Sequence, residues 1–246
     1  MEHDRLELPG NRVLAYHRQA GAGPGVVFLG GFRSDMTGTK ARYLADWCAA
    51  RGRAFLRFDY TGHGASSGDF LDGTIGDWAR DAHDILVTLT EGPQILVGSS
   101  MGGWISLLLA KRVPERIHAF VGIAAAPDFT EDSMWEGFSA AQREALVSTG
   151  RVALPSDYSG DPYIITRRLI EDGRAHLVLR EPLPLGFPVR LLHGTADADV
   201  PASVALRLLA HAEAPDLRLT LVAGADHRFS EPQNLELISE TVEALS

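Results

Sequence analysis

Short, almost continuous apolar runs recur along the chain and alternate with longer amphipathic stretches. These runs occupy residues 25–29, 53–59, 94–97, 118–124, 189–193 and 218–222. Strands this apolar are usually covered on both faces, and alternation with helical stretches is typical of βα units. The pattern therefore predicts an α/β fold in which helices flank a mostly parallel sheet.

The stretches between the runs repeat their apolar residues at helical spacing. The predicted helices cover residues 39–51, 76–90, 101–112 and 202–212 and a last segment from about residue 232. Thr74 is placed to cap the second helix, and Ser230 with Gln233 fits a capping box for the last one. Near the N-terminus, residues 5–8 and 12–17 flank a Pro-Gly-Asn turn and predict an antiparallel hairpin.

One long segment, residues 128–187, interrupts this alternation. It carries two amphipathic pieces and large side chains that include Trp135, Phe138, Tyr158 and Tyr163. Such a segment is long enough for a cap but short for an independent domain. We expect residues 1–246 to form one domain, into which residues 128–187 insert a small, mainly helical cap.

Composition narrows the classes of protein that fit this fold. The chain has 32 acidic and 23 basic residues, a net charge of −9, which disfavours a nucleic-acid binder. Its single cysteine, Cys48, excludes an internal disulfide and a cysteine-based zinc site. No apolar run approaches the roughly 18–20 residues of a membrane span, and the first ten residues do not resemble a secretory signal. We therefore expect a cytoplasmic protein without stable membrane insertion; the excess of arginine over lysine, with many alanines, indicates a bacterial source.

The most informative segment is GSSMG, which follows an apolar run and precedes a predicted buried helix. This is G-x-S-x-G in the strand–turn–helix context that the motif requires. The turn is so tight that the residues two before and two after the serine cannot carry side chains, which explains Gly98 and Gly102. Ser100 has glycine at both positions, whereas Ser99 has Val97 at one of them. Ser100 is therefore the predicted nucleophile, at a helix N-terminus that favours developing negative charge.

A serine hydroxyl needs a base to become a good nucleophile. In hydrolases with this motif the chain order is serine, acid, histidine. His227 follows the apolar run 218–222 in a loop, which places it at the same edge of the sheet as Ser100. His63 comes before Ser100 and so breaks the order, and His211 falls within a predicted helix. The pattern indicates His227 as the base.

An acid should orient the histidine and stabilise its protonated form. The loop after the apolar run 189–193 offers Asp197 and Asp199. Asp226 is a third candidate, but its position next to His227 in the chain disfavours a productive geometry. Spacing alone leaves Asp197 and Asp199 as alternatives.

A glycine pair follows the first apolar parallel run, in the segment LGGFRSD. Such a pair lets a backbone N–H group turn toward the nucleophile. We expect the N–H groups of Phe32 and Met101 to form an oxyanion hole, in which each donor contributes roughly 3–4 kcal/mol to transition-state stabilisation.

Five segments, GGF, FDYTGHGASSG, GSSMGG, HGTADADVP and GADH, together resemble the α/β-hydrolase family over nearly the whole chain. In that family the acid stands four residues after the histidine of the HG segment and four before the proline, which implies Asp197. The resemblance thus implies Ser100, Asp197 and His227 as a catalytic triad. The segments GFRSDMTGTKA, RFDYTGHGASSGDF and GPQILVGSSMGGW are similar to a mitochondrial branch of the family. Its members are described as palmitoyl-protein thioesterases and acyl-glucuronide esterases.

The expected activity is hydrolysis of carboxylic esters or thioesters through an acyl-enzyme, without a metal or another cofactor. The resemblance implies palmitoyl-type S-acyl thioesters or acyl-glucuronide-like esters, carried by a small molecule or an S-acylated protein. Amide, carbon–carbon and perhydrolase chemistry on the same triad are alternatives. A non-catalytic binding protein of this fold is disfavoured because all three triad residues are present.

Substrate contacts are expected on both sides of the nucleophile. Trp135 and Phe138 of the inserted segment are predicted to line an acyl cavity above Ser100. Arg33 is predicted to form part of an open, polar rim on the side of the leaving group.

Overall fold

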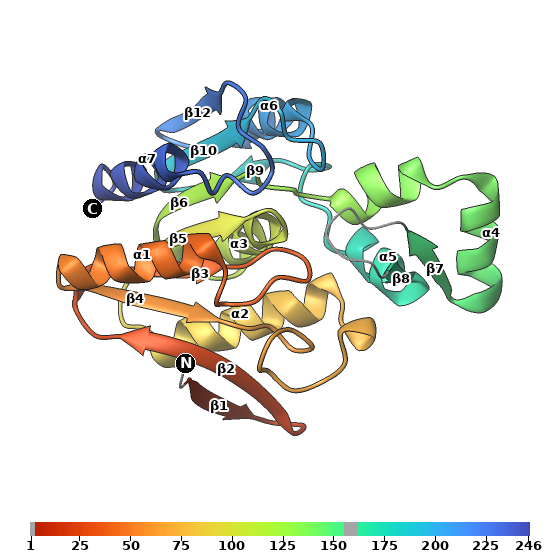
Figure 1. The fold of residues 1–246 in the computed structure, drawn as a ribbon, viewed down its shortest axis with the longest axis horizontal. Coiled ribbons are helices and arrows are strands. Elements are labelled where there is room, and N and C mark those ends of the chain that lie inside the picture. Colours follow the sequence, from red (N-terminus) through yellow and green to blue (C-terminus); the bar gives the residue numbers. More distant parts are fainter. Residues whose placement is uncertain (1–2, 155–161) are drawn as a thin grey trace.

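A sheet of eight strands forms the centre of the described residues (Figure 1). The structure is a computed structural model that describes residues 3–154 and 162–246. The strands are β1 (Asp4–Leu8), β2 (Arg12–Gln19), β3 (Ala22–Leu29), β4 (Arg53–Phe58), β5 (Gln94–Ser99), β6 (Ile117–Ile123), β10 (Val189–Gly194) and β12 (Leu217–Val222). Their order is β1-β2-β4-β3-β5-β6-β10-β12. β1–β2 and β2–β4 pair antiparallel and the other pairs are parallel, so the predicted N-terminal hairpin and mostly parallel sheet are confirmed.

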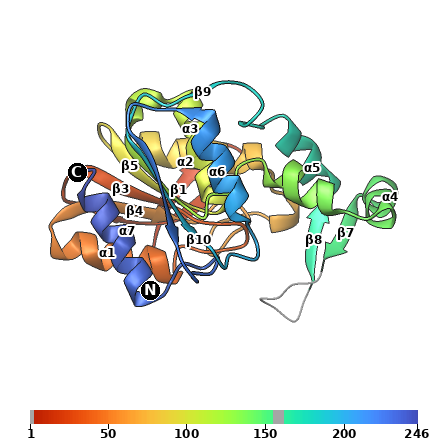
Figure 2. The same cartoon turned by 90° about the horizontal axis from the view of Figure 1, so that it is seen from above.

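Helices cover both faces of this sheet (Figure 2). They are α1 (Thr39–Ala50), α2 (Ile75–Leu89), α3 (Met101–Arg112), α6 (Ala202–His211) and α7 (Pro232–Glu243), with short 3₁₀ turns η1 (Phe70–Asp72) and η2 (Pro114–Arg116). Side chains alternate along a strand, so Val26 and Phe28 pack with α1 and α7, whereas Val27 and Leu29 pack with α2 and α3. This double burial explains the continuous apolar runs. In the part of the chain that is described, no helix combines the length and apolar character of a membrane span.

The helix caps agree with the sequence in one place and differ in another. The Thr74 hydroxyl accepts a hydrogen bond from the N–H group of Asp77 at 3.1 Å, so Thr74 caps α2 as predicted. The predicted capping box at the last helix is wrong. Pro232 is the first residue of α7, so the N-cap is Glu231, and the Ser230 hydroxyl donates instead to the Arg228 carbonyl.

The inserted segment projects from one side of the sheet (Figure 1). Its elements are the π-helix η3 (Thr130–Trp135), α4 (Ala140–Thr149), β7 (Arg151–Leu154), β8 (Tyr163–Thr166) and α5 (Arg167–Arg174). A short strand, β9 (Leu183–Pro184), then pairs with β11 (Ala212–Glu213). The segment is mainly helical, but it also contains the antiparallel pair β7–β8, which the sequence did not predict. Residues 155–161, with Tyr158, lie outside the described residues.

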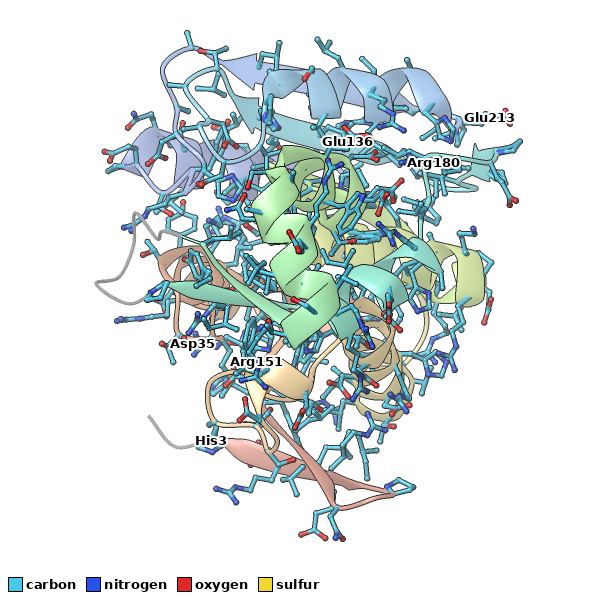
Figure 3. All side chains as sticks on the ribbon, turned by 90° about the vertical axis from the view of Figure 1, so that its right-hand side faces the viewer. His3, Asp35, Glu136, Arg151, Arg180 and Glu213 are labelled. Carbon is cyan, nitrogen blue, oxygen red and sulfur yellow. The ribbon has the colours of Figure 1, made fainter. Side chains whose placement is uncertain are left out.

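Two acidic side chains, the buried Asp128 and the partly exposed Asp132, connect the start of the insertion to its end. The fully buried Asp128 carboxylate accepts a hydrogen bond from the N–H group of Val178 at 2.8 Å. Asp132 forms ion pairs with Arg180 and, at 2.6 Å, with Arg207 of α6. Viewed from the side of the insertion, α4 and α5 lie in front of the sheet (Figure 3). The insertion is therefore tied to the body of the protein at the sheet edge where the parallel strands end.

Candidate active site

Ser100 lies at the sharp turn between β5 and α3, with φ 54° and ψ −118°. A non-glycine residue rarely adopts a positive φ. A Cβ atom on Gly98 would lie 2.4 Å from the Gly102 carbonyl oxygen, and one on Gly102 would lie 2.1 Å from the Leu29 carbonyl oxygen. The turn therefore requires both glycines, as the motif predicts.

Hydrogen bonds to the end of β6 hold this strained turn. The Ser100 N–H group donates to the Ile123 carbonyl at 2.9 Å, and the Ser100 carbonyl accepts from the Ala126 N–H group at 3.1 Å. The Ser100 side chain consequently stands at the N-terminus of α3, where the helix dipole favours a developing oxyanion.

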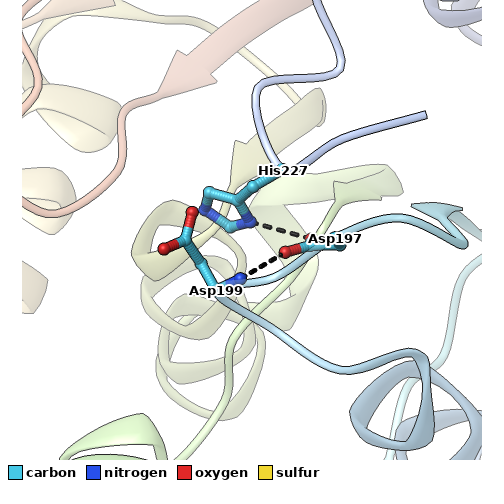
Figure 4. A group of neighbouring side chains, drawn as sticks. All are labelled: Asp197, Asp199 and His227. Atoms are coloured by element: carbon cyan, nitrogen blue, oxygen red, sulfur yellow. Dashed lines mark hydrogen bonds and ion pairs between the residues drawn. The ribbon is translucent and has the colours of Figure 1, made fainter. Parts of the chain in front are cut away.

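The loops after β5, β10 and β12 bring three side chains together. His227 Nε2 lies 3.1 Å from Ser100 Oγ, and His227 Nδ1 lies 2.8 Å from Asp197 Oδ2. A carboxylate oxygen can only accept, so Nδ1 carries the proton and Nε2 offers its lone pair to the serine hydroxyl. Figure 4 shows His227 and Asp197 with the adjacent Asp199.

Both aspartates lie near the histidine, and Asp197 is the one that accepts the hydrogen bond from its Nδ1 atom. Its side chain is fully buried, and its other oxygen, Oδ1, accepts hydrogen bonds from the N–H groups of Val200 at 2.8 Å and Asp199 at 3.0 Å. Burial raises the pKa of Asp197, but the hydrogen bonds from His227 and Val200 outweigh this effect, so the pKa falls below its usual value. The carboxylate is therefore ionised in the neutral range. Asp199 is exposed, and its backbone holds Asp197 in place (Figure 4).

The segment after β3 lies directly beside Ser100. A Cβ atom on Gly31 would lie 3.3 Å from Ser100 Cβ, and Phe32 lines the same cavity as Ser100. Met101 is the first residue of α3, so its N–H group has no acceptor within the helix. Phe32 and Met101 thus both adjoin Ser100, and the oxyanion role of their N–H groups stays a prediction.

A cavity of about 320 Å³ opens over Ser100 and His227, between the sheet edge and the insertion. Most of its wall is apolar. The side chains that form this apolar wall are Phe32, Phe129, Met134, Leu154, Ile165 and Val204. Asp132, Ser133 and Asp199 add polar groups. The cavity can hold an apolar chain attached to a carbonyl at Ser100.

Trp135 and Phe138 do not line this cavity in the described residues, contrary to the prediction. The Trp135 ring lies against the guanidinium groups of Arg143 and Arg174, at 5.1 and 4.5 Å from the ring centroid. Phe138 is 6% exposed and belongs to the buried core. The insertion uses these two rings for its own packing, and its neighbouring Met134 reaches the cavity instead.

Arg33 lies beside the cavity rather than in its lining. Its guanidinium carbon is 5.1 Å from the ring centroids of both Phe70 and Tyr163. Tyr163 is itself a lining residue, so Arg33 lies next to the cavity wall, and its role on the side of the leaving group stays a prediction.

Other cavity residues escaped the sequence analysis. Leu154 and Val204 belong to β7 and α6, where their apolar character indicates burial but not which neighbour they meet. Val200 lies in the loop that carries Asp197 and Asp199, and it lines the cavity only because this loop adjoins the site. No local pattern distinguishes such residues from ordinary core residues.

In the described part of the chain, one group of side chains could offer three ligand atoms to a metal ion. It comprises Asp197, Asp199 and His227, whose ligand atoms lie within 4.8 Å of one another. Asp197 already accepts hydrogen bonds on both oxygens, from His227 and from two backbone N–H groups. These bonds match an acid–base relay to Ser100 better than a cation site.

The chain is similar to known proteins over nearly its whole length. The chain is 38% identical over 242 residues to palmitoyl-protein thioesterase ABHD10, mitochondrial, of Rattus norvegicus, covering 98% of this chain and 80% of the rat protein. The Homo sapiens protein of the same name is 35% identical over 243 residues, covering 98% of this chain and 78% of that protein.

Two proteins of known structure align with this chain over its whole length. A protein from Agrobacterium vitis S4 aligns with a TM-score of 0.95 at 41% identity, over 99% of this chain and 98% of that one. Alpha/beta hydrolase domain-containing protein 10 from mouse aligns with a TM-score of 0.92 at 36% identity, over 100% and 98% of the two chains. Residues 25–172 match the Hydrolase_4 family, described as serine aminopeptidase, S33. The chain therefore belongs to the Hydrolase_4 family of α/β-hydrolases.

Proposed function

We propose that this protein is a serine hydrolase that cleaves carboxylic esters or thioesters through an acyl-enzyme on Ser100. The observation that carries the proposal is the hydrogen-bonded chain from Ser100 Oγ through both ring nitrogens of His227 to Asp197, at 3.1 and 2.8 Å. A nucleophile, a base within reach of its proton and a group that orients the base are the parts that nucleophilic catalysis needs.

Acylation begins when His227 Nε2 takes the proton of Ser100 Oγ, which forms a bond to the carbonyl carbon of the substrate. The carbonyl π electrons move to its oxygen, and the N–H groups of Phe32 and Met101 stabilise the resulting oxyanion. Asp197 stabilises the imidazolium through Nδ1–H. When the oxyanion collapses, the bond to the leaving oxygen or sulfur breaks, and His227 returns the proton to the leaving group.

Deacylation repeats these steps with water as the nucleophile. His227 Nε2 takes a proton from water as the oxygen attacks the acyl carbon. Collapse of the second oxyanion breaks the bond to Ser100 Oγ, which recovers the proton from His227. The carboxylic acid leaves and the enzyme is restored with all protons balanced.

The cavity supports a substrate with an apolar acyl group. Its wall includes Phe129, Met134 and Ile165, which would contact the chain beyond the carbonyl. Each buried methylene contributes about 0.8 kcal/mol, close to fourfold in affinity. We therefore propose medium or longer acyl chains. Similarity to proteins named palmitoyl-protein thioesterase favours S-acyl thioesters of proteins or small molecules among the substrates.

The leaving group would exit past the polar mouth. Arg33 is exposed there, next to Tyr163, so the mouth can accept a polar alcohol or thiol, including an acyl-glucuronide-like leaving group. We propose Arg33 as a contact on this side and the apolar wall as the contact on the acyl side.

A fluorophosphonate probe tests the nucleophile. We expect wild type to be labelled and Ser100→Ala not to be labelled. His227→Ala should react orders of magnitude more slowly, because Ser100, His227 and Asp197 act as a unit. His211→Ala is the matched control, since His211 Nε2 lies 2.7 Å from the Glu181 carbonyl and away from Ser100. Labelling that survives Ser100→Ala, or is lost in His211→Ala but not in His227→Ala, contradicts the assignment.

Substrate series then test the reaction. p-Nitrophenyl esters and S-acyl thioesters of acetyl to palmitoyl length should show kcat/KM rising with chain length. Highest activity on acetyl esters, with a steady fall as the chain grows, would refute the acyl cavity but keep the serine mechanism. Turnover of amides alone would refute the ester and thioester proposal.

A further inference from the structure

His63, in the turn after β4, is a buried titratable side chain that the proposed mechanism does not use. It is 4% exposed. Its Nε2 atom accepts a hydrogen bond from the Arg33 N–H group at 3.3 Å, and its Nδ1 atom lies 3.2 Å from the Thr61 carbonyl oxygen. The imidazole therefore joins the GHG turn to the segment that carries Phe32, thirty positions earlier in the chain.

The surroundings of His63 fix both its protonation and its orientation. The Thr61 carbonyl can only accept, so Nδ1 carries the hydrogen and Nε2 carries the lone pair. Burial lowers the pKa of His63 to about 4, although the bond to Thr61 opposes the shift. Its ring lies edge-on to Phe70 and Trp78, each at a centroid distance of 5.1 Å. A fixed acceptor thus faces the Arg33 N–H group.

That N–H group belongs to a strained turn. Gly31, Phe32, Arg33 and Ser34 form a β-turn, closed by the Ser34 N–H bond to the Gly31 carbonyl at 3.1 Å. Arg33, its third residue, has φ 57°, the left-handed conformation that glycine normally supplies in a type II turn. With arginine in this position, the type I turn competes, in which the peptide between Phe32 and Arg33 is flipped. After the flip, the Phe32 carbonyl oxygen rather than an N–H group would face the Nε2 lone pair.

The orientation of this turn bears on the oxyanion hole. Gly31 lies against Ser100, and the turn's second residue, Phe32, supplies a proposed oxyanion donor. The Phe32 N–H group lies in the peptide before Phe32, so a flip of the following peptide does not reverse it. The flip changes the ψ of Phe32 and the φ of Arg33, which shifts the turn that carries this group, and a displacement of about 1 Å in such a group costs on the order of 100-fold in rate.

We propose that His63 is a positioning residue for catalysis: its Nε2 lone pair holds the Phe32–Arg33 peptide in its strained orientation and so keeps the turn, with the Phe32 N–H group, in place beside the oxyanion. The proposal rests on the proposed serine hydrolase function. His63 acts through the backbone of Arg33 and does not touch the reacting atoms.

The test starts with His63→Phe, which keeps an aromatic ring in the cluster and removes the acceptor. We expect kcat on a p-nitrophenyl ester to fall roughly 10- to 100-fold with little change in KM, because the oxyanion exists only in the transition state. The Ki of a boronic acid that forms a tetrahedral adduct should rise by a similar factor. His63→Gln, whose side-chain oxygen can accept from Arg33, should recover most of kcat. His118→Phe is the matched control, since His118 bonds the Leu245 carbonyl away from the site, and its kcat should not change.

A double-variant cycle separates positioning from simple destabilisation. Glycine adopts a positive φ without strain, so in the Arg33→Gly background the turn no longer depends on His63. We expect His63→Phe to lower kcat by less than about threefold there, against 10- to 100-fold with Arg33 present. An equal loss in both backgrounds, or a loss confined to KM, overturns the proposal.

Two further comparisons keep the test decisive. If His63→Phe does not fold, His63→Gln is compared with His63→Asn instead. The glutamine oxygen can accept from the Arg33 N–H group, whereas the shorter asparagine cannot reach it. Equal kcat values for these two variants then overturn the proposal. Wild-type turnover that is unaffected by Ser100→Ala refutes the serine hydrolase function itself. Serine-dependent turnover that His63→Phe leaves at the wild-type level refutes the positioning role alone.

Discussion

Replacing Asp197 by asparagine tests the direction of the hydrogen bonds that link Asp197, His227 and Ser100, that is, which atom donates in each bond. Asp197 Oδ1 accepts two backbone N–H bonds, from Val200 and Asp199, while Oδ2 accepts the Nδ1–H of His227. In Asp197→Asn the side-chain oxygen should stay with the two backbone donors, because an NH₂ group there would leave both unsatisfied. The NH₂ group then faces His227 Nδ1 and donates to it. His227 consequently carries its proton on Nε2, where it cannot accept from Ser100.

The expected loss of kcat in Asp197→Asn follows from the hydrogen bonds that the substitution changes. Flipping the asparagine amide would restore the correct tautomer but leave the N–H group of the buried Val200 unpaired, at about 1–3 kcal/mol, while the exposed Asp199 N–H group can turn to water. The productive form is therefore disfavoured by roughly 1–3 kcal/mol, and each 1.4 kcal/mol is a factor of ten. Loss of the carboxylate charge, which stabilises the imidazolium, adds to this, so we expect kcat to fall by about 10³- to 10⁴-fold, with KM changing little.

The assay is steady-state hydrolysis of a p-nitrophenyl ester, with the rate of fluorophosphonate labelling as a second readout. Asp199→Asn is the control, because Asp199 is the alternative acid and undergoes the same chemical change two positions away. Its kcat should stay within about tenfold of wild type, since its backbone rather than its carboxylate supports Asp197. Retention of a tenth of wild-type kcat in Asp197→Asn, or an equal loss in Asp199→Asn, would refute the reasoning.

Three other substitutions probe the turn, the cavity and the partly buried amine of Lys40. Gly98→Ala places a Cβ atom 2.4 Å from the Gly102 carbonyl oxygen, so the turn must open; we expect a loss of about 1–3 kcal/mol in the free energy of unfolding by urea, and an unchanged midpoint would contradict this. Met134→Trp narrows the cavity, so the ratio of kcat/KM for octanoyl over acetyl esters should fall severalfold; an unchanged ratio would remove Met134 from the acyl wall. Burial lowers the pKa of Lys40 from 10.5 to about 8, so between these values the unfolded chain binds more protons and the stability of the wild type should rise with pH. Lys40→Met should lack this rise, as measured by urea unfolding across that range; parallel curves for the two proteins would contradict the lowered pKa of Lys40.

Much of the architecture is encoded locally. An apolar run that is buried on both faces appears in the sequence as consecutive apolar residues, because Val26 and Val27 face different helices but both avoid water. The turn at Ser100 is also local, since Gly98 and Gly102 meet each other within five positions. Contacts between residues so close in the chain depend on the backbone conformation of a single segment. The residue types that this conformation requires therefore appear in the sequence as a pattern.

The arrangement of side chains at the site depends on contacts across the sheet edge. Residue spacing left Asp197 and Asp199 as alternatives, and the family resemblance favoured Asp197. The two backbone N–H bonds to Asp197 Oδ1 fix which carboxylate turns inward to His227. The start of the last helix is a smaller case, since Pro232 set its boundary against the capping pattern of Ser230.

The insertion shows why the cavity wall could not be predicted from composition. Trp135 and Met134 are adjacent apolar residues, yet Met134 lines the cavity while Trp135 packs against two arginines of α4 and α5. Nor does the sequence reveal that His63 accepts from the Arg33 N–H group. The sequence by itself determined the fold, the tight turn that carries Ser100 and the residue types near it. Only the tertiary structure decided which side chains meet, because that depends on how separately formed elements pack and not on the local preference of any one of them.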